Sequence, residues 1–302
     1  MIDDPAVLSF LLALLAGLAG WLLGRQAGRR ERPPWRADYA RGLEHLLNRR
    51  LDAAAYELLR SASGDDDAVE LQFALGGLFR KRGEFGRATQ LHERLAEHAD
   101  AAIAERARFE LAQDYMAAGL LDRAEQTLLQ LAAGGAHRDA ALLQLAKIYE
   151  TESDWDNALR VHLALPAELQ AERAAVAAHY LCELAEHALL QGDLSRVATL
   201  LQEAERHCPS HARIALLRGQ WAERQALAEL ARDSYRRACR LRPPLSGEIS
   251  ARLAALGDTA DVAATERPRY QCSACGFPSL HWHWRCPRCF AWDQLDLVLA
   301  QR

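Results

Sequence analysis

The chain has 302 residues, half of them apolar, with a formal net charge of −4 and an isoelectric point of about 6.3. This mildly acidic balance provides no general attraction to nucleic acid, so we expect no nucleic-acid partner. Only 7% of the residues are aromatic and helix-forming residues dominate, which predicts an all-α architecture before the tail. Four of the seven cysteines cluster near the C-terminus, which argues against a secreted disulfide scaffold.

Residues 5–24 form an uncharged apolar stretch, PAVLSFLLALLAGLAGWLLG. A helix of this length extends roughly 30 Å, the thickness of a bilayer's hydrocarbon core. Five arginines follow it (Arg25, Arg29, Arg30, Arg32 and Arg36), so the positive-inside rule predicts that the rest of the chain lies in the cytoplasm. A cleaved signal peptide would need its positive charges before the apolar stretch. The pattern predicts an uncleaved single-pass transmembrane anchor (residues 1–24) and a basic juxtamembrane linker (residues 25–37).

A pattern of small and large residues recurs through residues 38–244. Equivalent positions fall at 41, 75, 111, 145, 184 and 218, in steps of 34, 36, 34, 39 and 34 residues. Thirty-four residues is the tetratricopeptide period, so we predict about six such repeats, stacked into a superhelix. Small residues are expected where the helices of a pair cross (Gly76, Ala88, Ala112, Ala124, Ala146 and Ala158). Large residues are expected to fill the gap to the next repeat (Phe79, Tyr115 and Tyr149), and glycines to form turns (Gly83, Gly119 and Gly192).

The inner face of a tetratricopeptide superhelix usually binds peptides or protein segments. The alternative is that this face packs against the chain's own tail or against a second copy, and the sequence leaves a homo-oligomer open. We interpret Cys182, Cys208 and Cys239 as small buried hydrophobic residues. Several helix histidines show no metal-pair spacing and are interpreted as ordinary helix residues (His92, His162, His179 and His187).

The tail is separated from the repeats by a polar linker (residues 245–267) and contains two Cys-x-x-Cys motifs. The motifs are Cys272/Cys275 and Cys286/Cys289, and in such motifs both sulfurs of a tight turn face one ion. We predict that residues 268–302 form a rubredoxin-like ribbon around one structural metal ion, either zinc or iron. So short a segment buries too little apolar surface alone, so metal binding should supply most of its folding free energy.

Two disulfides are the competing interpretation of these four cysteines, and a reducing cytosolic location makes them less favourable. His281 and His283 lie nearby, but four thiolates saturate the ion, so both are expected to be surface or packing residues. No phosphate loop, nucleophile elbow or zinc-protease motif occurs in the chain. We therefore predict no catalytic residues, no further cofactor-binding residues and no enzyme activity.

Anchor, repeats and ribbon in this order resemble the lipopolysaccharide assembly protein LapB (YciM) family. The similar segments include LGGLFRKRGEFGRA at 75–88, DYMAAGLLDRAE at 114–125, HYLCELA at 179–185, and RPRYQCSACGF with WRCPRCFAW in the tail. The resemblance implies an inner-membrane adaptor of Gram-negative bacteria that directs the protease FtsH to LpxC, the committed enzyme of lipid A synthesis. It also implies contacts with other lipopolysaccharide-assembly proteins of the inner membrane, and a tail packed against the repeats.

The chain departs from this family in one respect, because only residues 245–267 join the sixth repeat to the tail. Family members carry further repeats there, so this chain is a shortened relative. Partner contacts made by those late repeats are not carried over. Two other functions remain open from the residues: a membrane-tethered scaffold for a different complex, and a rubredoxin-type redox protein.

Overall fold

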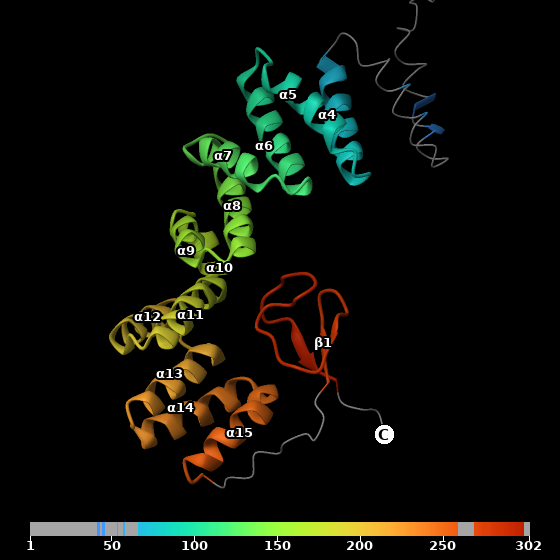
Figure 1. The fold of residues 1–302 in the computed structure, drawn as a ribbon. Coiled ribbons are helices and arrows are strands. Elements are labelled where there is room, and N and C mark those ends of the chain that lie inside the picture. The colour runs from blue at the N-terminus through green and yellow to red at the C-terminus, as the bar shows by residue number, and fades with distance from the viewer. Residues whose placement is uncertain are drawn as a thin grey trace, which may run out of the picture. The chain divides into compact units, whose positions relative to one another are not determined.

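The computed structural model describes residues 66–258 and 269–298, together with six isolated residues before them (41, 42, 44, 45, 53 and 57) (Figure 1). The predicted anchor and basic linker lie outside these residues. Across the described ranges, no helix combines the length and apolarity needed to cross a membrane. The chain divides into two compact units, residues 1–124 and residues 125–302, and each is considered separately.

The described part is mostly helical and ends in a small sheet. Its helices are α4 (Asp66–Lys81), α5 (Phe85–Ala96), α6 (Ala101–Ala117), α7 (Leu121–Ala132), α8 (Arg138–Glu152), α9 (Trp155–Leu163), α10 (Ala167–Glu172), α11 (Ala174–Gln191), α12 (Leu194–His207), α13 (Ala212–Arg224), α14 (Ala228–Leu241) and α15 (Ser246–Ala255). A 3₁₀ turn, η1 (Pro243–Leu245), precedes α15. The strands are β1 (Tyr270–Cys272), β2 (Pro278–Ser279) and β3 (Leu295–Leu297). The predicted tetratricopeptide-like helical fold is confirmed.

One turn geometry joins the two helices of every described pair. One or two positions after the first helix ends, a residue is left-handed in all five turns (Gly83, Gly119, Ser153, Gly192 and Ala226, with φ between 58° and 80°). The next residue then donates its backbone N–H to the carbonyl five positions back, as Glu84 does to Phe79 (2.9 Å) and Asp154 to Tyr149 (2.8 Å). This Schellman bond satisfies a carbonyl that the helix end would leave free. The predicted turn glycines are therefore confirmed.

The predicted small residues lie where two helices cross. The side chains of Ala88, Ala112, Ala124, Ala146 and Ala158 are buried. Of the predicted large residues, Phe79 and Tyr149 are buried, whereas Tyr115 is only partly covered. The 39-residue step between repeats contains the extra helix α10, which begins directly after Pro166. Proline cannot continue a helix, so the longer step becomes a short additional helix rather than a longer one.

Gly76 shows why one crossing requires a residue without a side chain. The imidazole of His92 on α5 lies directly over it, and a Cβ at Gly76 would stand 2.3 Å from His92 Nε2. The imidazole is held in place by a 2.5 Å contact between His92 Nδ1 and Asp114 Oδ2. Arg80 in turn donates to Asp114 Oδ1 at 2.7 Å. Because this buried network links α4, α5 and α6, His92 has no room to move aside.

His162, on α9, is a buried histidine with a different environment. Its side chain is 1% exposed, and neither ring nitrogen has a hydrogen-bond partner among the described residues. Burial lowers the pKa of His162 to about 4, with His207 and Arg173 adding to the effect. The imidazole is therefore neutral at pH 7 and packs as an apolar ring.

Substituting Gly76 and its neighbour separates crowding from helix propensity. We expect Gly76→Ala to lower the free energy of unfolding by about 1–3 kcal/mol, because the new methyl group overlaps His92. Gly77→Ala, in the same helix, meets no atom within 4 Å and should instead stabilise by up to about 1 kcal/mol through helix propensity. Urea unfolding followed by circular dichroism measures both, and equal effects would contradict the close crossing.

Acid should destabilise the second unit through His162. The pKa of His162 in the folded chain lies below that of an unfolded histidine. Its contribution to the free energy of unfolding is therefore fully present above pH 6.5 and is lost as the pH drops towards 4. Between pH 7 and pH 5 this group should contribute about 2 kcal/mol of the loss, and His162→Leu should remove that part. Urea unfolding at both pH values tests it, with His187→Leu at an exposed site as control. An unchanged pH dependence in His162→Leu would contradict the assignment.

Candidate metal centre

The tail is an antiparallel three-stranded sheet, in the order β2-β1-β3, with two cysteine turns beside it. The two turns repeat one hydrogen-bond pattern. The Cys272 carbonyl accepts from Gly276 (2.8 Å) and its amide donates to Phe277 (2.9 Å), as Cys286 does with Phe290 and Ala291 (both 2.9 Å). Both turns need a left-handed residue at the same place, which is Gly276 in the first and Phe290 in the second.

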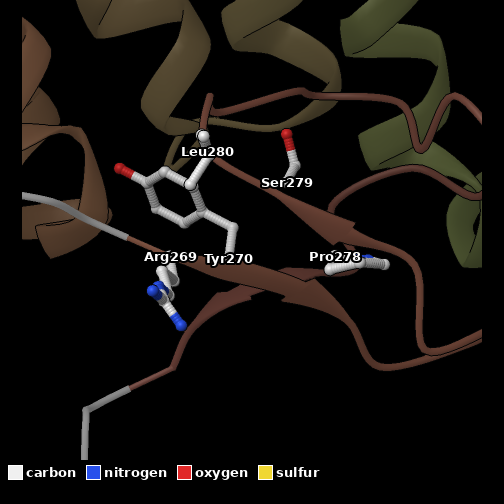
Figure 2. Close-up of a pocket in the computed structure, with 5 residues that line it drawn as sticks. All are labelled: Arg269, Tyr270, Pro278, Ser279 and Leu280. Carbon is white, nitrogen blue, oxygen red and sulfur yellow. The ribbon is translucent and has the colours of Figure 1, made fainter.

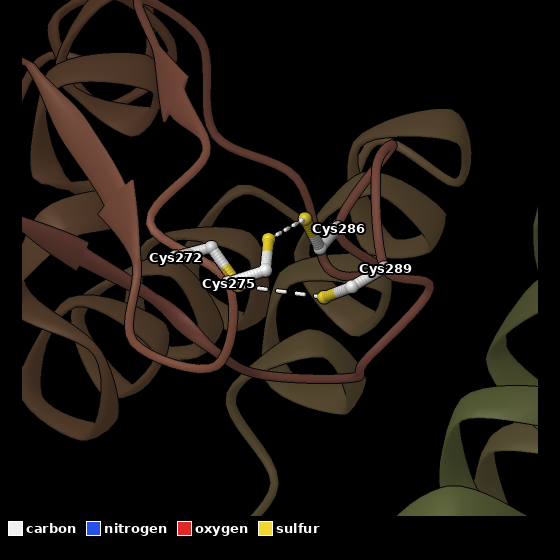
Figure 3. A group of neighbouring side chains, drawn as sticks. All are labelled: Cys272, Cys275, Cys286 and Cys289. Atoms are coloured by element: carbon white, nitrogen blue, oxygen red, sulfur yellow. Dashed lines mark hydrogen bonds between the residues drawn. The ribbon is translucent and has the colours of Figure 1, made fainter. Parts of the chain in front are cut away.

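These turns bring all four predicted cysteines together (Figure 3). The Sγ atoms of Cys272 and Cys289 lie 3.7 Å apart, and so do those of Cys275 and Cys286. A tetrahedral ion with metal–sulfur bonds of about 2.3 Å places its sulfurs about 3.8 Å apart. A disulfide would require about 2.05 Å. The geometry fits one ion held by four thiolates, and the prediction of one structural metal ion in a rubredoxin-like ribbon is confirmed.

The four sulfurs differ in environment. The first cysteine of each turn is buried (Cys272 and Cys286), whereas the second is more exposed (Cys275 and Cys289). Burial tends to raise the pKa of the Cys286 thiol, but the backbone amides of Cys289 and Arg288, together with the neighbouring thiols of Cys289 and Cys272, outweigh this and lower it. Amides that point at sulfur stabilise the thiolate, which is the form that binds a metal.

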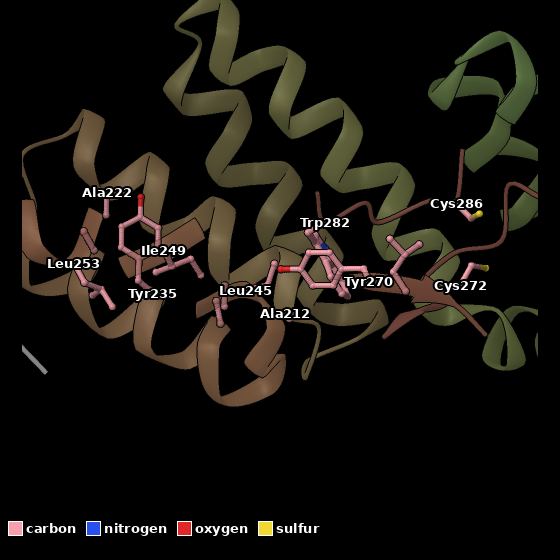
Figure 4. Close-up of a cluster of buried hydrophobic side chains, with 14 residues drawn as sticks. Ala212, Ala222, Tyr235, Leu245, Ile249, Leu253, Tyr270, Cys272, Trp282 and Cys286 are labelled. Carbon is pink, nitrogen blue, oxygen red and sulfur yellow. The ribbon is translucent and has the colours of Figure 1, made fainter. Parts of the chain in front are cut away.

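The ribbon shares its apolar core with the last helices of the chain. Tyr270, Trp282 and Leu295 of the tail belong to the same buried cluster as Tyr235 on α14 and Leu245 in η1 (Figure 4). Cys272 and Cys286 lie in this cluster too, so the inner side of the metal centre faces the helices. The tail is therefore packed against the repeats, as the family resemblance implied.

Two arginines connect the ribbon to the helices by polar contacts. Arg242, which follows α14, donates to the carbonyls of Asp293 (2.9 Å) and Leu295 (3.1 Å), and its guanidinium lies over the Trp282 ring. Arg285 of the ribbon donates to the carbonyl of Glu150 on α8 (2.7 Å) and pairs with its carboxylate (3.3 Å). Both sets of bonds hold the ribbon in one orientation on the second unit.

A second cluster of polar residues joins the ribbon to α11 and α13. His179 Nε2 lies 2.7 Å from Asp293 Oδ2 and 3.2 Å from Nε2 of His211, while Trp292 stacks on the His179 ring at 4.4 Å. Burial lowers the pKa of His179 to about 4. The hydrogen bonds from both histidines outweigh burial and lower the pKa of Asp293 well below its usual range. The interpretation of His179 as an ordinary helix residue was therefore wrong, because its partners come from distant segments.

The other candidate residues have packing roles. Cys182 is fully buried and burial raises its pKa to about 12, so its thiol behaves as the predicted small hydrophobic residue. Cys208 and Cys239 are partly buried against apolar clusters. His281 is exposed, and His283 Nε2 lies 3.1 Å from Ser279 Oγ, away from the sulfurs.

A small pocket of about 310 Å³ lies at the β1–β2 edge of the ribbon (Figure 2). Its lining residues are Arg269, Tyr270, Pro278, Ser279 and Leu280, of which only Arg269 is charged. Polar groups that converge on a ligand distinguish a binding site from a surface hollow, and here the Tyr270 hydroxyl donates to Pro244 and the Ser279 hydroxyl to His281.

The fold and the site define a class, namely helical-repeat proteins that carry a four-cysteine metal ribbon docked on their last repeats. Residues 270–296 match the family of rubredoxin metal-binding domains described for LapB. Lipopolysaccharide assembly protein B of Escherichia coli (strain K12) is 28% identical over 380 aligned residues, which cover 96% of this chain and 98% of that protein. That of Haemophilus influenzae is 26% identical over 80% of this chain and 64% of that protein. The chain is therefore similar to lipopolysaccharide assembly protein B along nearly its whole length, and the predicted resemblance is confirmed.

The aligned region is longer than the 302 residues of this chain, so the Escherichia coli relative has residues without a counterpart here. This agrees with the prediction of a shortened relative. Among solved structures, a MamA structure (AMB-1) is similar with a TM-score of 0.40 and 19% identity, covering 62% of this chain and 98% of MamA. The assembly chaperone of RpL4 (Acl4) has a TM-score of 0.42 and 14% identity over 64% of this chain and 86% of that chain.

We expect serine at any one of the four clustered cysteines to unfold the ribbon, because the thiolates and their ion provide most of its folding free energy. Cys286→Ser should lose the bound metal and make Trp282 accessible to a fluorescence quencher, while the helical circular dichroism signal remains. Cys208→Ser, outside the cluster, is the matched control and should keep both metal and quenching at wild-type levels. A Cys286→Ser protein with intact metal content and buried Trp282 would contradict this.

Proposed function

We propose that this chain is an inner-membrane adaptor that regulates lipopolysaccharide synthesis by promoting the degradation of LpxC by FtsH. The observation that carries the proposal is the match to lipopolysaccharide assembly protein B along 96% of the chain, across both the repeats and the ribbon. This homology supports a role in lipopolysaccharide assembly. FtsH and LpxC as partners are the finer part of the proposal and come from the family resemblance.

In this proposal, the parts of the chain have separate roles. Residues 5–24 anchor the chain with its bulk on the cytoplasmic side, and residues 25–37 link the anchor to the repeats. Residues 38–244 bind the partner proteins, and residues 268–302 form the ribbon. The predicted linker between them (residues 245–267) contains helix α15, whose Ile249 and Leu253 are buried in the shared core. Cys272, Cys275, Cys286 and Cys289 hold one zinc or iron ion, whose role is structural. An adaptor of this kind needs no reacting group, only two proteins held close together.

The docked ribbon supports a specific distribution of binding surfaces. It contacts Glu150 on α8, His179 on α11 and Arg213 at the start of α13, so this face of three successive repeats is already covered. A partner segment would therefore use the first helices of the earlier repeats, α4 and α6, or the outward side of the ribbon. With either location the ribbon remains necessary for a stable repeat array, because loss of the ribbon would expose the apolar helix surface that it now covers.

Depletion of the protein in its own host tests the proposal. We expect the abundance and half-life of LpxC to rise several-fold, because its degradation loses the adaptor, and full-length protein supplied in trans should restore both. A form lacking residues 1–24 should restore them only weakly, since tethering next to a membrane protease raises the local concentration. Quantitative immunoblotting after translation is blocked measures the LpxC half-life.

Two outcomes would contradict the proposal. An unchanged LpxC half-life after depletion would exclude the adaptor role and favour a scaffold for a different membrane complex. Full rescue by the form lacking residues 1–24 would exclude the tethering part alone. An inactive Cys286→Ser protein that still appears in the membrane fraction serves as the control for expression.

A further inference from the structure

Three metal-binding side chains converge at a place separate from the four cysteines. His179 comes from α11, His211 from the residue before α13, and Asp293 from the ribbon ahead of β3. Their ligand atoms all lie within 4.8 Å of one another. The separations are 2.7 Å between His179 Nε2 and Asp293 Oδ2, 3.2 Å between the two Nε2 atoms, and 3.6 Å between His211 Nε2 and Asp293 Oδ2.

Two of these distances, 3.2 Å and 3.6 Å, are close to the face of a metal tetrahedron, and the 2.7 Å hydrogen bond would lengthen on metal binding. Zinc binds imidazole nitrogen and carboxylate oxygen at 2.0–2.2 Å, which places neighbouring ligand atoms about 3.3 Å apart. The three observed separations lie on both sides of that value. Two imidazoles and one carboxylate are also a ligand set that zinc and similar transition ions prefer.

His179 Nε2 lies close to both Asp293 Oδ2 and His211 Nε2, and a neutral imidazole nitrogen carries either one proton or one lone pair. Hydrogen bonds among the three groups are one way to satisfy these atoms. A cation that accepts a lone pair from each of the three atoms is the other.

The surrounding charges also favour a cation. Arg213 lies 3.5 Å from the other nitrogen of His179, but its guanidinium is paired with Glu183 and Glu186, both at 2.9 Å. With Asp293, three carboxylates therefore stand against Arg213 and against Arg242, which donates to the Asp293 carbonyl, so one excess negative charge remains for a cation to offset. The two histidines are buried, whereas the side chains of Asp293, Glu183 and Glu186 are 25–39% exposed, so water screens the carboxylates in part.

We propose that His179, His211 and Asp293 bind one divalent transition ion, such as Zn²⁺, in a site distinct from the four-cysteine centre. Because two ligands come from the helices and one from the ribbon, the ion fastens the ribbon to α11 and α13. The stacked Trp292 and the nearby Trp284 cover the imidazoles and limit access of water. The ribbon's folding and its docking would thus depend on two separate ions.

Metal stoichiometry tests this proposal on the full-length protein purified in detergent. After loading with Zn²⁺ and dialysis against a weak chelator, mass spectrometry should find two equivalents in the wild type and one in His211→Ala. His187→Ala, an exposed position on α11, is the matched control and should keep two. Loading with Co²⁺ gives a second readout, because only the four-cysteine site produces an intense sulfur-to-metal charge-transfer band. The second equivalent should add weak visible bands alone.

The outcomes distinguish the possible explanations. A single equivalent in the wild type, or two in both the wild type and His211→Ala, would overturn the proposal. If His211→Ala binds none because the ribbon has unfolded, His211→Gln and Asp293→Asn decide, since each keeps a hydrogen-bonding group of similar size. One equivalent in these variants against two in the wild type supports the site, and any other stoichiometry overturns it.

Discussion

The structure of the second unit depends on one interaction, the shared core between the metal ribbon and the last helices. The ribbon buries too few apolar residues to be stable alone, so its fold depends on the metal and on helix surface supplied by α13, α14 and η1. In this core Tyr235 lies over Gly219 of α13 and beside Ile249 and Leu253 of α15, whereas Leu245 lies nearer to Tyr270 and Trp282 of the ribbon (Figure 4). Repeat proteins need a covering element at their ends, and here α15 follows α14 with Ile249 and Leu253 buried in the same core. Metal binding in the tail therefore determines whether this helix surface stays covered.

This arrangement decides between two uses of the repeat surface that the sequence left open. The first helices of three successive repeats contact the chain's own tail through Glu150, His179 and Arg213. The tail is held there by directional bonds as well as by apolar burial, since Arg242 and Arg285 both donate to backbone carbonyls. Carbonyl acceptors have fixed positions, so these bonds determine the orientation of the ribbon. The docked tail is present in a chain that is shorter than the region over which it aligns with its relative.

The repeat period was predictable because it depends on local requirements that each repeat must meet alone. A small residue is needed where helices cross, and a left-handed residue is needed to end the first helix. Gly83, Gly119 and Gly192 meet the second requirement in a recognisable way, whereas Ser153 and Ala226 adopt the same conformation without being glycine. The sequence indicated those two turns only by their spacing within the repeat. The collision that forbids a side chain at Gly76 depends on His92 of the following helix, so the pattern indicated a close crossing but not its partner.

The four cysteines and the cluster around His179 show where sequence information ends. Each pair of cysteines lies within one tight turn, so their spacing alone indicated that the sulfurs meet at one ion. His179, His211 and Asp293 are far apart in the chain and belong to three different elements, so no spacing relates them. They meet only because the ribbon docks in one orientation on α11 and α13, a result of packing over many residues. Local chemistry was therefore encoded in short motifs, whereas the long-range site was decided by the tertiary contacts that hold the tail in place.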